Sequence, residues 1–256
     1  DLETLFPEDL IEIELNVGVK KVLVSLKQSR LPNSDVIVYF IDNNEYFGSH
    51  SEIYPQKKHA EFEQERFIVF GLATLKLMQK IGFKPDIIHC NDWHTANIPV
   101  QLKTKPEEFS YFSESAIIFS IHNLAYQGLF NKDILSFANL DVSALYNPEY
   151  LEFYGDINWM KGGIIFADRI NTVSKKYAEE IQTKEYGEKL DGLLIANNNK
   201  LSGILNGLDT EEWNPKTDSA IPANYSQEDL TGKKVCKKAL QNEFGLKQLL
   251  SVPLFG

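Results

Sequence analysis

A cluster of hydrogen-bonding side chains directly follows an apolar run in the middle of this 256-residue chain. The run, residues 116–121, is rich in β-branched and aromatic side chains, which predicts a strand buried on both faces within a parallel sheet. Four polar residues come next: His122, Asn123, Tyr126 and Gln127. Because ligands of open α/β sheets bind at the carboxyl ends of strands, we interpret this cluster as a candidate binding site. The alternative is that His122 and Asn123 are satisfied inside the fold.

A second polar group follows the predicted strand at residues 85–90. His89, Cys90, Asp92 and His94 are all residue types that can ligate a metal ion. Consecutive strand residues point to opposite faces, so His89 and Cys90 can share one ion only across a bulge. Two other interpretations stay open. In one, His89 is satisfied in the core and Asp92 caps the next helix. In the other, Asp92, Trp93 and His94 meet a polar, sugar-like ligand.

Three further motifs carry weaker signals. Residues 161–163 (Lys-Gly-Gly) fall within a helical pattern rather than after a strand, and no Gly-x-Gly-x-x-Gly or Walker sequence occurs, so a phosphate cradle is not indicated there. Ser174 lacks the Gly-x-Ser-x-Gly context of a hydrolase nucleophile and is expected to cap a helix. Asn206-Gly207 ends a predicted strand, where this pair commonly forms a turn.

Strands and helices alternate along most of the chain. Apolar and polar residues alternate loosely over residues 11–26, which indicates edge-like strands with one solvent-exposed face. The remaining expected strands are residues 36–41, 85–90, 116–121, 168–173 and 200–205, and the expected helices are 61–81, 98–103, 159–167, 175–181 and 233–244. This order predicts an α/β fold with a Rossmann-like, doubly wound, mostly parallel sheet.

Composition limits the classes of partner. The chain is 43% hydrophobic and 24% charged, which is ordinary for a globular protein. The formal net charge of -10 disfavours nucleic acid and anionic membranes as partners. No stretch approaches the roughly 18 apolar residues of a membrane helix. Two cysteines form no disulfide framework, which suits a reducing cytosol.

Several motifs, in the right order, resemble the bacterial glycogen synthases and plant starch synthases. They are His-Cys-Asn-Asp-Trp-His-Thr (89–95), Ile-His-Asn-Leu-Ala-Tyr-Gln-Gly (121–128), Asn-Thr-Val-Ser (171–174), Gly-Ile-Leu-Asn-Gly-Leu-Asp (203–209) and Trp-Asn-Pro (213–215). The resemblance extends from about residue 36 to the C-terminus. It implies the N-terminal half of a GT-B glycosyltransferase of the fifth family. Such an enzyme moves glucose from ADP-glucose to the non-reducing end of an α-1,4-glucan with retention of configuration.

The resemblance also implies roles for individual residues. His122 corresponds to the histidine that contacts the donor glucose and supports the transition state, with Asn123 beside it. Asp92 is implied to be catalytic together with His122. The substrate-binding residues that the resemblance implies in the glucose and acceptor region are Trp93, His94, Tyr126, Gln127 and Asn206. No cofactor or metal is implied beyond the donor substrate ADP-glucose, and the location implied is the cytoplasm, or the plastid in a plant.

Two departures from the family shape the expected domains. The Lys-x-Gly-Gly-Leu motif that binds the diphosphate does not occur, and neither does the C-terminal Rossmann domain. We therefore expect a catalytic domain over residues 1–215, then a linker, a helix and the start of a truncated domain over residues 216–256, with the isolated chain inactive. Two alternatives are a non-catalytic glucan-binding module and a GT-B transferase that uses a UDP-sugar.

Overall fold

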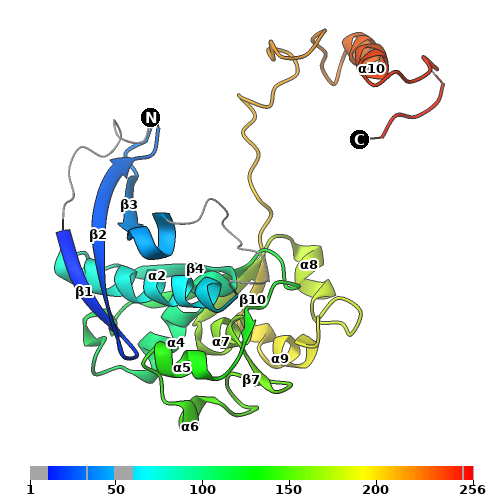
Figure 1. Ribbon diagram of the computed structural model, residues 1–256. Coiled ribbons are helices and arrows are strands. Elements are labelled where there is room, and N and C mark those ends of the chain that lie inside the picture. Colours follow the sequence, from blue (N-terminus) through cyan, green and yellow to red (C-terminus); the bar gives the residue numbers. More distant parts are fainter. Residues whose placement is uncertain (1–10, 33, 49–59, 250, 256) are drawn as a thin grey trace. The chain divides into compact units, whose positions relative to one another are not determined.

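The computed structural model describes residues 11–32, 34–48, 60–249 and 251–255 (Figure 1). The chain divides into two compact units, Asp1–Leu205 and Asn206–Gly256. The domain boundary expected after residue 215 stays a prediction. Within the described residues, no helix is both long enough and apolar enough to cross a membrane.

The centre of the first unit is a four-stranded parallel sheet. Its strands are β4 (Ile87–Asn91), β5 (Ala116–Ile121), β9 (Arg169–Thr172) and β10 (Leu201–Gly203), in the order β10-β9-β5-β4. Residues 119–121 of β5 are buried on both faces of the sheet, as the apolar run predicts. The predicted α/β class with a Rossmann-like parallel sheet is thereby confirmed.

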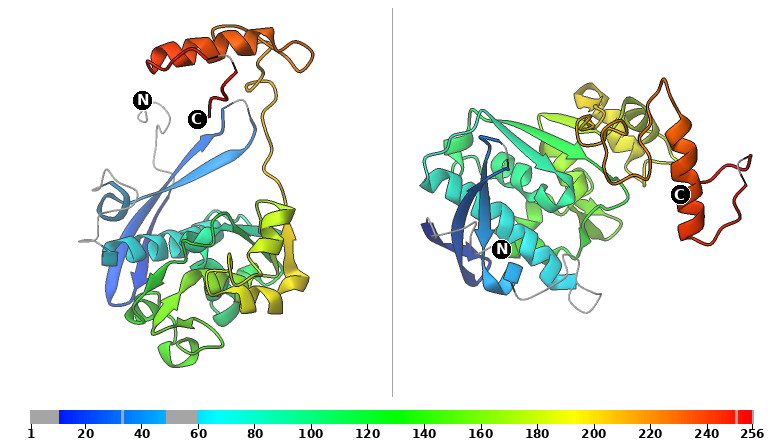
Figure 2. Two further views of the ribbon diagram at one scale, coloured as in Figure 1. Left: turned by 90° about the vertical axis from the view of Figure 1, so that its right-hand side faces the viewer. Right: turned by 90° about the horizontal axis from the view of Figure 1, so that it is seen from above.

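The N-terminal strands form a separate antiparallel sheet. β1 (Ile11–Val17), β2 (Lys20–Arg30) and β3 (Ile37–Asp42) lie in sequence order, and both views of Figure 2 show them beside the first long helix, α2 (Ala60–Lys80). The strand expected at residues 36–41 is thus present but outside the parallel sheet. The link between β2 and β3 is too short for the crossover that a parallel pair requires.

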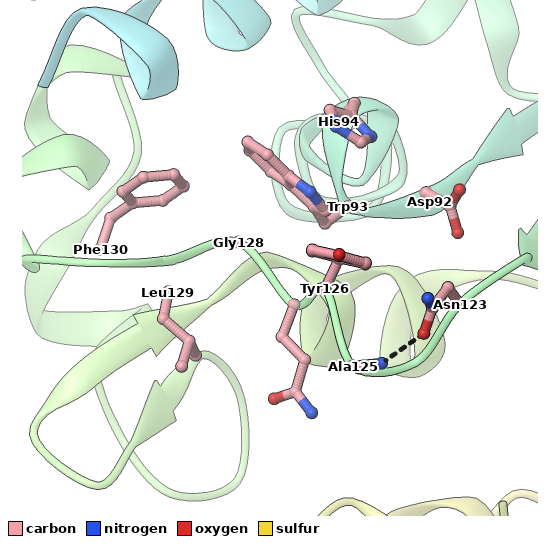
Figure 3. Close-up of a pocket in the computed structure, with 10 residues that line it drawn as sticks. Asp92, Trp93, His94, Asn123, Ala125, Tyr126, Gly128, Leu129 and Phe130 are labelled. Carbon is pink, nitrogen blue, oxygen red and sulfur yellow. Dashed lines mark hydrogen bonds between the residues drawn. The ribbon is translucent and has the colours of Figure 1, made fainter. Parts of the chain in front are cut away.

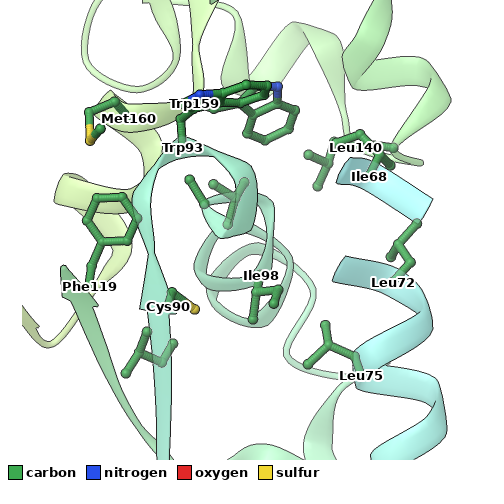
Figure 4. Close-up of a cluster of buried hydrophobic side chains, with 14 of the residues drawn as sticks. Ile68, Leu72, Leu75, Cys90, Trp93, Ile98, Phe119, Leu140, Trp159 and Met160 are labelled. Atoms are coloured by element: carbon green, nitrogen blue, oxygen red, sulfur yellow. The ribbon is translucent and has the colours of Figure 1, made fainter. Parts of the chain in front are cut away.

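The predicted helices around the sheet are present. They are α2, α4 (Asn97–Thr104), α7 (Trp159–Phe166) and α8 (Lys175–Glu180), and α3 (Asp92–Thr95) adds one short turn after β4. Leu72 and Leu75 of α2 and Ile98 of α4 belong to the buried cluster drawn in Figure 4. Ser174 caps α8 as predicted, because its Oγ accepts the Tyr177 N–H at 2.8 Å.

Shorter elements complete the two units. In the first unit, β6 (Leu129–Phe130), β8 (Asp156–Asn158) and β7 (Glu152–Phe153) form a small antiparallel sheet that the sequence patterns did not reveal. Its short helices are α5 (Asp133–Phe137), α6 (Val142–Leu145) and α9 (Asp191–Ala196), with single helical turns η1 (Asn44–Gly48), η3 (Ser110–Phe112) and η4 (Asn198–Lys200). The second unit contains α10 (Thr231–Glu243), which matches the helix expected at residues 233–244.

Candidate functional site

A cavity of about 740 Å³ opens where β4 and β5 end (Figure 3). One wall is the turn of α3, and the other is the loop that leads from β5 to β6. The residues that line the cavity are Asp92, Trp93, His94, Asn123, Ala125, Tyr126, Gln127, Gly128, Leu129 and Phe130. Six of the residues predicted from sequence therefore come together here, although they lie in two segments about thirty positions apart.

Asp92 and Asn91 tie His122 to the end of the neighbouring strand. The His122 backbone N–H donates to Asp92 Oδ1 at 2.8 Å, and His122 Nε2 lies 3.0 Å from Asn91 Oδ1. Since an amide oxygen only accepts, Nε2 is the nitrogen that donates, and a neutral imidazole then leaves Nδ1 as an acceptor. The backbone of Asp92 is in the left-handed region, with φ of 55°, a strained conformation that often marks functional sites.

Trp93 forms an aromatic wall that the opposite loop approaches closely. Its ring centroid is 5.0 Å from that of Phe67 and 5.4 Å from that of Phe130. Gly128 has φ of 65°, and a Cβ at this position would lie 2.5 Å from Trp93 Cε3. Only glycine fits this contact, so the Gly that ends the motif sets how near the loop comes to the indole.

His94 packs beside Trp93, with ring centroids 4.2 Å apart. Burial lowers the pKa of His94 below its ordinary value, and the nearby Asp92 carboxylate offsets part of that shift. The imidazole is therefore mostly neutral at pH 7. It adds a polar, uncharged edge to the cavity.

Gln127 holds the loop instead of presenting a free amide. Its Oε1 accepts from Asn158 Nδ2 at 2.6 Å, and its Nε2 donates to the Glu188 carbonyl at 3.0 Å. The predicted role of Gln127 in substrate binding stays a prediction, but its contacts support a role in positioning. Asn123 Oδ1 accepts the Ala125 N–H at 3.0 Å, while Tyr126 is 68% exposed.

His122, His89 and Cys90 are not among the residues that line this cavity. His89 Nε2 is 2.6 Å from Ser120 Oγ, whereas Cys90 is buried, so the two side chains diverge as strand alternation requires. Among the described residues, no three His, Cys, Asp or Glu side chains gather as metal ligands would. Lys161 is buried within α7 and donates to the carbonyls of Pro148 and Glu152. Asn206 begins the second unit, and its predicted sugar contact stays a prediction.

Two residues that matter to the site were missed in the sequence. Asn91 lies within the motif of residues 89–95 without being predicted as a site residue, yet it holds the His122 ring. Its signal is its position, because Asn91 is the last residue of a strand that ends beside His122. Asn158 is fully buried, caps α7 by accepting the Lys161 N–H at 2.9 Å, and also bonds Gln127. No local pattern reveals the partner of Asn158, which lies 31 residues away.

Comparisons with known proteins agree with this geometry. The model of the starch synthase catalytic domain matches residues 3–196. The glycogen synthase of Thermotoga maritima is 50% identical over 219 residues, covering 86% of this chain and 44% of the relative. That of Thermosipho africanus is 45% identical over 229 residues, covering 90% and 46%. The chain thus spans about half the length of the curated relatives it matches.

A solved structure gives the class of protein. The catalytic domain of starch synthase IV from Arabidopsis thaliana, bound to ADP and acarbose, superposes with a TM-score of 0.79 at 32% identity, covering 93% of this chain and 48% of that one. The parallel sheet therefore matches that of a GT-B glycosyltransferase catalytic domain. Within that class, the chain belongs to the starch synthase catalytic domain family.

Proposed function

We propose that this chain supplies the glucose-binding and glucan-binding part of a retaining glucosyltransferase. Its donor is ADP-glucose, and its acceptor is the non-reducing end of an α-1,4-glucan. The observation that carries the proposal is the cavity lined by Asp92, Trp93 and Asn123, together with the bonds by which Asp92 and Asn91 hold His122 at its edge. Aromatic faces and fixed hydrogen-bonding groups suit hydroxyl-bearing sugar rings.

The proposed chemistry fits these hydrogen-bonding groups. Retaining transfer passes through an oxocarbenium-like centre, and rigid hydrogen-bonding groups lower such a barrier because they are already oriented in the ground state. His122 would contact the donor glucose, while Asp92 would fix the His122 backbone. Trp93, His94 and Tyr126 would face the sugar rings.

The comparisons support the choice of substrates. The curated relatives bear the name glycogen synthase, and the Arabidopsis neighbour was solved with ADP and acarbose. We include in the proposal that no cofactor or metal takes part and that the protein works in the cytoplasm, or in the plastid in a plant. The free thiols of Cys90 and Cys236 support a reducing compartment.

The decisive experiment is ADP release from ADP-glucose in the presence of glycogen. The assay uses a chimera in which this chain replaces the matching residues of the Thermotoga maritima relative, with UDP-glucose as the alternative donor. We expect turnover with ADP-glucose, and a loss of at least about 100-fold in the His122→Ala chimera, the usual effect of removing one transition-state donor.

Other results would contradict the proposal. Turnover only with UDP-glucose would favour a different GT-B transferase. A folded chimera that binds glycogen yet is inert with both donors would favour a glucan-binding module.

A further inference from the structure

The turn between β7 and β8 exposes an aromatic ring outside the cavity. Phe153 pairs with Asp156, which leaves Tyr154 and Gly155 as a two-residue hairpin turn. Their φ angles are 54° and 97°, so both central residues adopt positive φ, as in type I′ turns. Gly155 suits its position in this turn.

Tyrosine is an unusual choice at the first position of such a turn. Asn, Asp and Gly are favoured there, because a larger L-residue is strained in the left-handed region. The side chain of Tyr154 is 76% exposed, so burial of its ring does not compensate for that strain. A strained, exposed aromatic residue indicates a use for the ring outside the fold.

A lysine from a loop distant in sequence contacts the exposed Tyr154 ring. Lys189 Nζ lies 4.9 Å from the centroid of the Tyr154 ring, and the Phe153 ring stands nearly perpendicular to it at 4.8 Å. Lys189 is itself in the left-handed region, with φ of 67°, as is Glu188 before it, with φ of 48°. Two backbone segments with left-handed residues, the hairpin turn and the loop of Lys189, therefore meet at this ring.

Gln127 joins both of these backbones to the cavity. Its Oε1 bonds to Asn158, the last residue of the strand that follows the turn, and its Nε2 bonds to the carbonyl of Glu188. The amide of one cavity residue thus fixes the segment that carries Tyr154 and the segment that carries Lys189. The exposed pair is therefore connected through Gln127 to the wall of the candidate site.

We propose that Tyr154 and Lys189 form an outer binding site for an α-glucan chain. A glucose ring would stack its C–H face on the Tyr154 ring, and neighbouring hydroxyls would accept hydrogen bonds from Lys189 Nζ. This inference rests on the proposed function, because that function supplies a polymeric acceptor whose chain extends beyond the cavity. The site would hold the acceptor at sugars remote from the end that is extended.

The test measures glucan binding by the 256-residue chain itself. The probes are glycogen in affinity electrophoresis and maltoheptaose in calorimetry. The main variant is Tyr154→Asn, which places a favoured residue in the turn and is expected to keep or raise the melting temperature. A second variant is Lys189→Gln. The matched control is Tyr225→Asn, because Lys233 Nζ also lies 4.9 Å from the Tyr225 ring, but in the second unit.

We expect Tyr154→Asn to weaken glucan binding about tenfold, Lys189→Gln to weaken it by a smaller factor, and Tyr225→Asn to leave it unchanged. Wild-type affinity in a folded Tyr154→Asn chain would overturn the outer site and leave the proposed function intact. If the wild-type chain binds no glucan while the chimera is active, the outer site is likewise overturned and the proposed function stands. An inert chimera would instead refute the proposed function, whatever the binding results.

Discussion

The His122 imidazole owes its orientation to Asn91. The 3.0 Å contact between Asn91 Oδ1 and His122 Nε2 joins the ends of β4 and β5, and it selects the tautomer with the proton on Nε2. Nδ1 is then the ring's acceptor. The Asn91 side chain thus determines which hydrogen bonds the His122 ring can offer to a ligand.

Replacing Asn91 with alanine tests this dependence. In Asn91→Ala we expect both neutral tautomers of His122 to be populated, and kcat of the chimera to fall about fivefold to tenfold through loss of one hydrogen bond of about 1 kcal/mol. Nitrogen NMR of the imidazole reports the tautomer without requiring activity. A wild-type tautomer in Asn91→Ala would show that other groups orient the ring.

At the scale of elements, Asn158 connects the start of α7 with the cavity loop. Asn158→Ala removes the cap of α7 and leaves the buried Oε1 of Gln127 without its donor. We expect a loss of about 2–4 kcal/mol in the free energy of unfolding, as the sum of a lost cap and an unsatisfied buried acceptor.

Ser174→Ala is the matched control for Asn158→Ala. It removes only the cap of α8, so about 1 kcal/mol is expected. Urea denaturation of both variants gives the comparison. Equal losses would show that the bond between Asn158 and Gln127 adds nothing to stability.

Asp168 joins α4 to the strands at the opposite end of the sheet. Burial alone would raise the pKa of Asp168, but the Lys103 ammonium and the Ile117 N–H, both at 2.8 Å, hold it below its ordinary value of 3.8. Because the pKa is depressed in the folded state, the carboxylate stabilises the fold above pH 3.8, and this contribution is lost as the pH falls further.

The corresponding prediction concerns Asp168→Asn. At pH 7 we expect the variant to be about 1 kcal/mol less stable, a modest figure because the ion pair with Lys103 is partly exposed to solvent. The difference should shrink as the pH falls below 3.8. Denaturation curves at pH 7 and pH 3 measure it, and a constant difference would contradict this account.

For the whole molecule, the two units differ in how well their helices are buried. α2 contributes fully buried apolar side chains such as Val69, Ala73 and Leu75, whereas the buried residues of α10 are Gly232 and Gln241. Local stability follows buried apolar contacts. The second unit should therefore open far more readily than the first.

Hydrogen exchange detects this difference. We expect the amides of α10 to exchange at least about 100-fold faster than those in the middle of α2, which should approach the global unfolding limit. Mass spectrometry of peptides from the two helices measures both rates in one sample. Equal protection of α10 and α2 would show that the second unit is stabilised by contacts beyond its own residues.

The sequence by itself determined the main helices and strands and much of the candidate site. The periodicity of α2, the apolar run of β5 and the cap at Ser174 are local patterns, so the residues within each segment suffice to predict them. The polar residues after β5 were predicted to form a site because ligands of open α/β sheets bind at the carboxyl ends of strands, and the resemblance to the synthases implied that those after β4 belong to the same region. Asp92, Trp93 and Asn123 do line one cavity.

Only the tertiary structure decided which side chains hold the others. Asn91 contacts His122, Asn158 contacts Gln127, and Lys189 contacts Tyr154, and each pair lies more than 30 residues apart in the chain. The strands of residues 11–42 likewise entered a separate sheet, because pairing between strands depends on the connections and not on the local pattern. Such contacts depend on packing between segments, which local spacing does not encode.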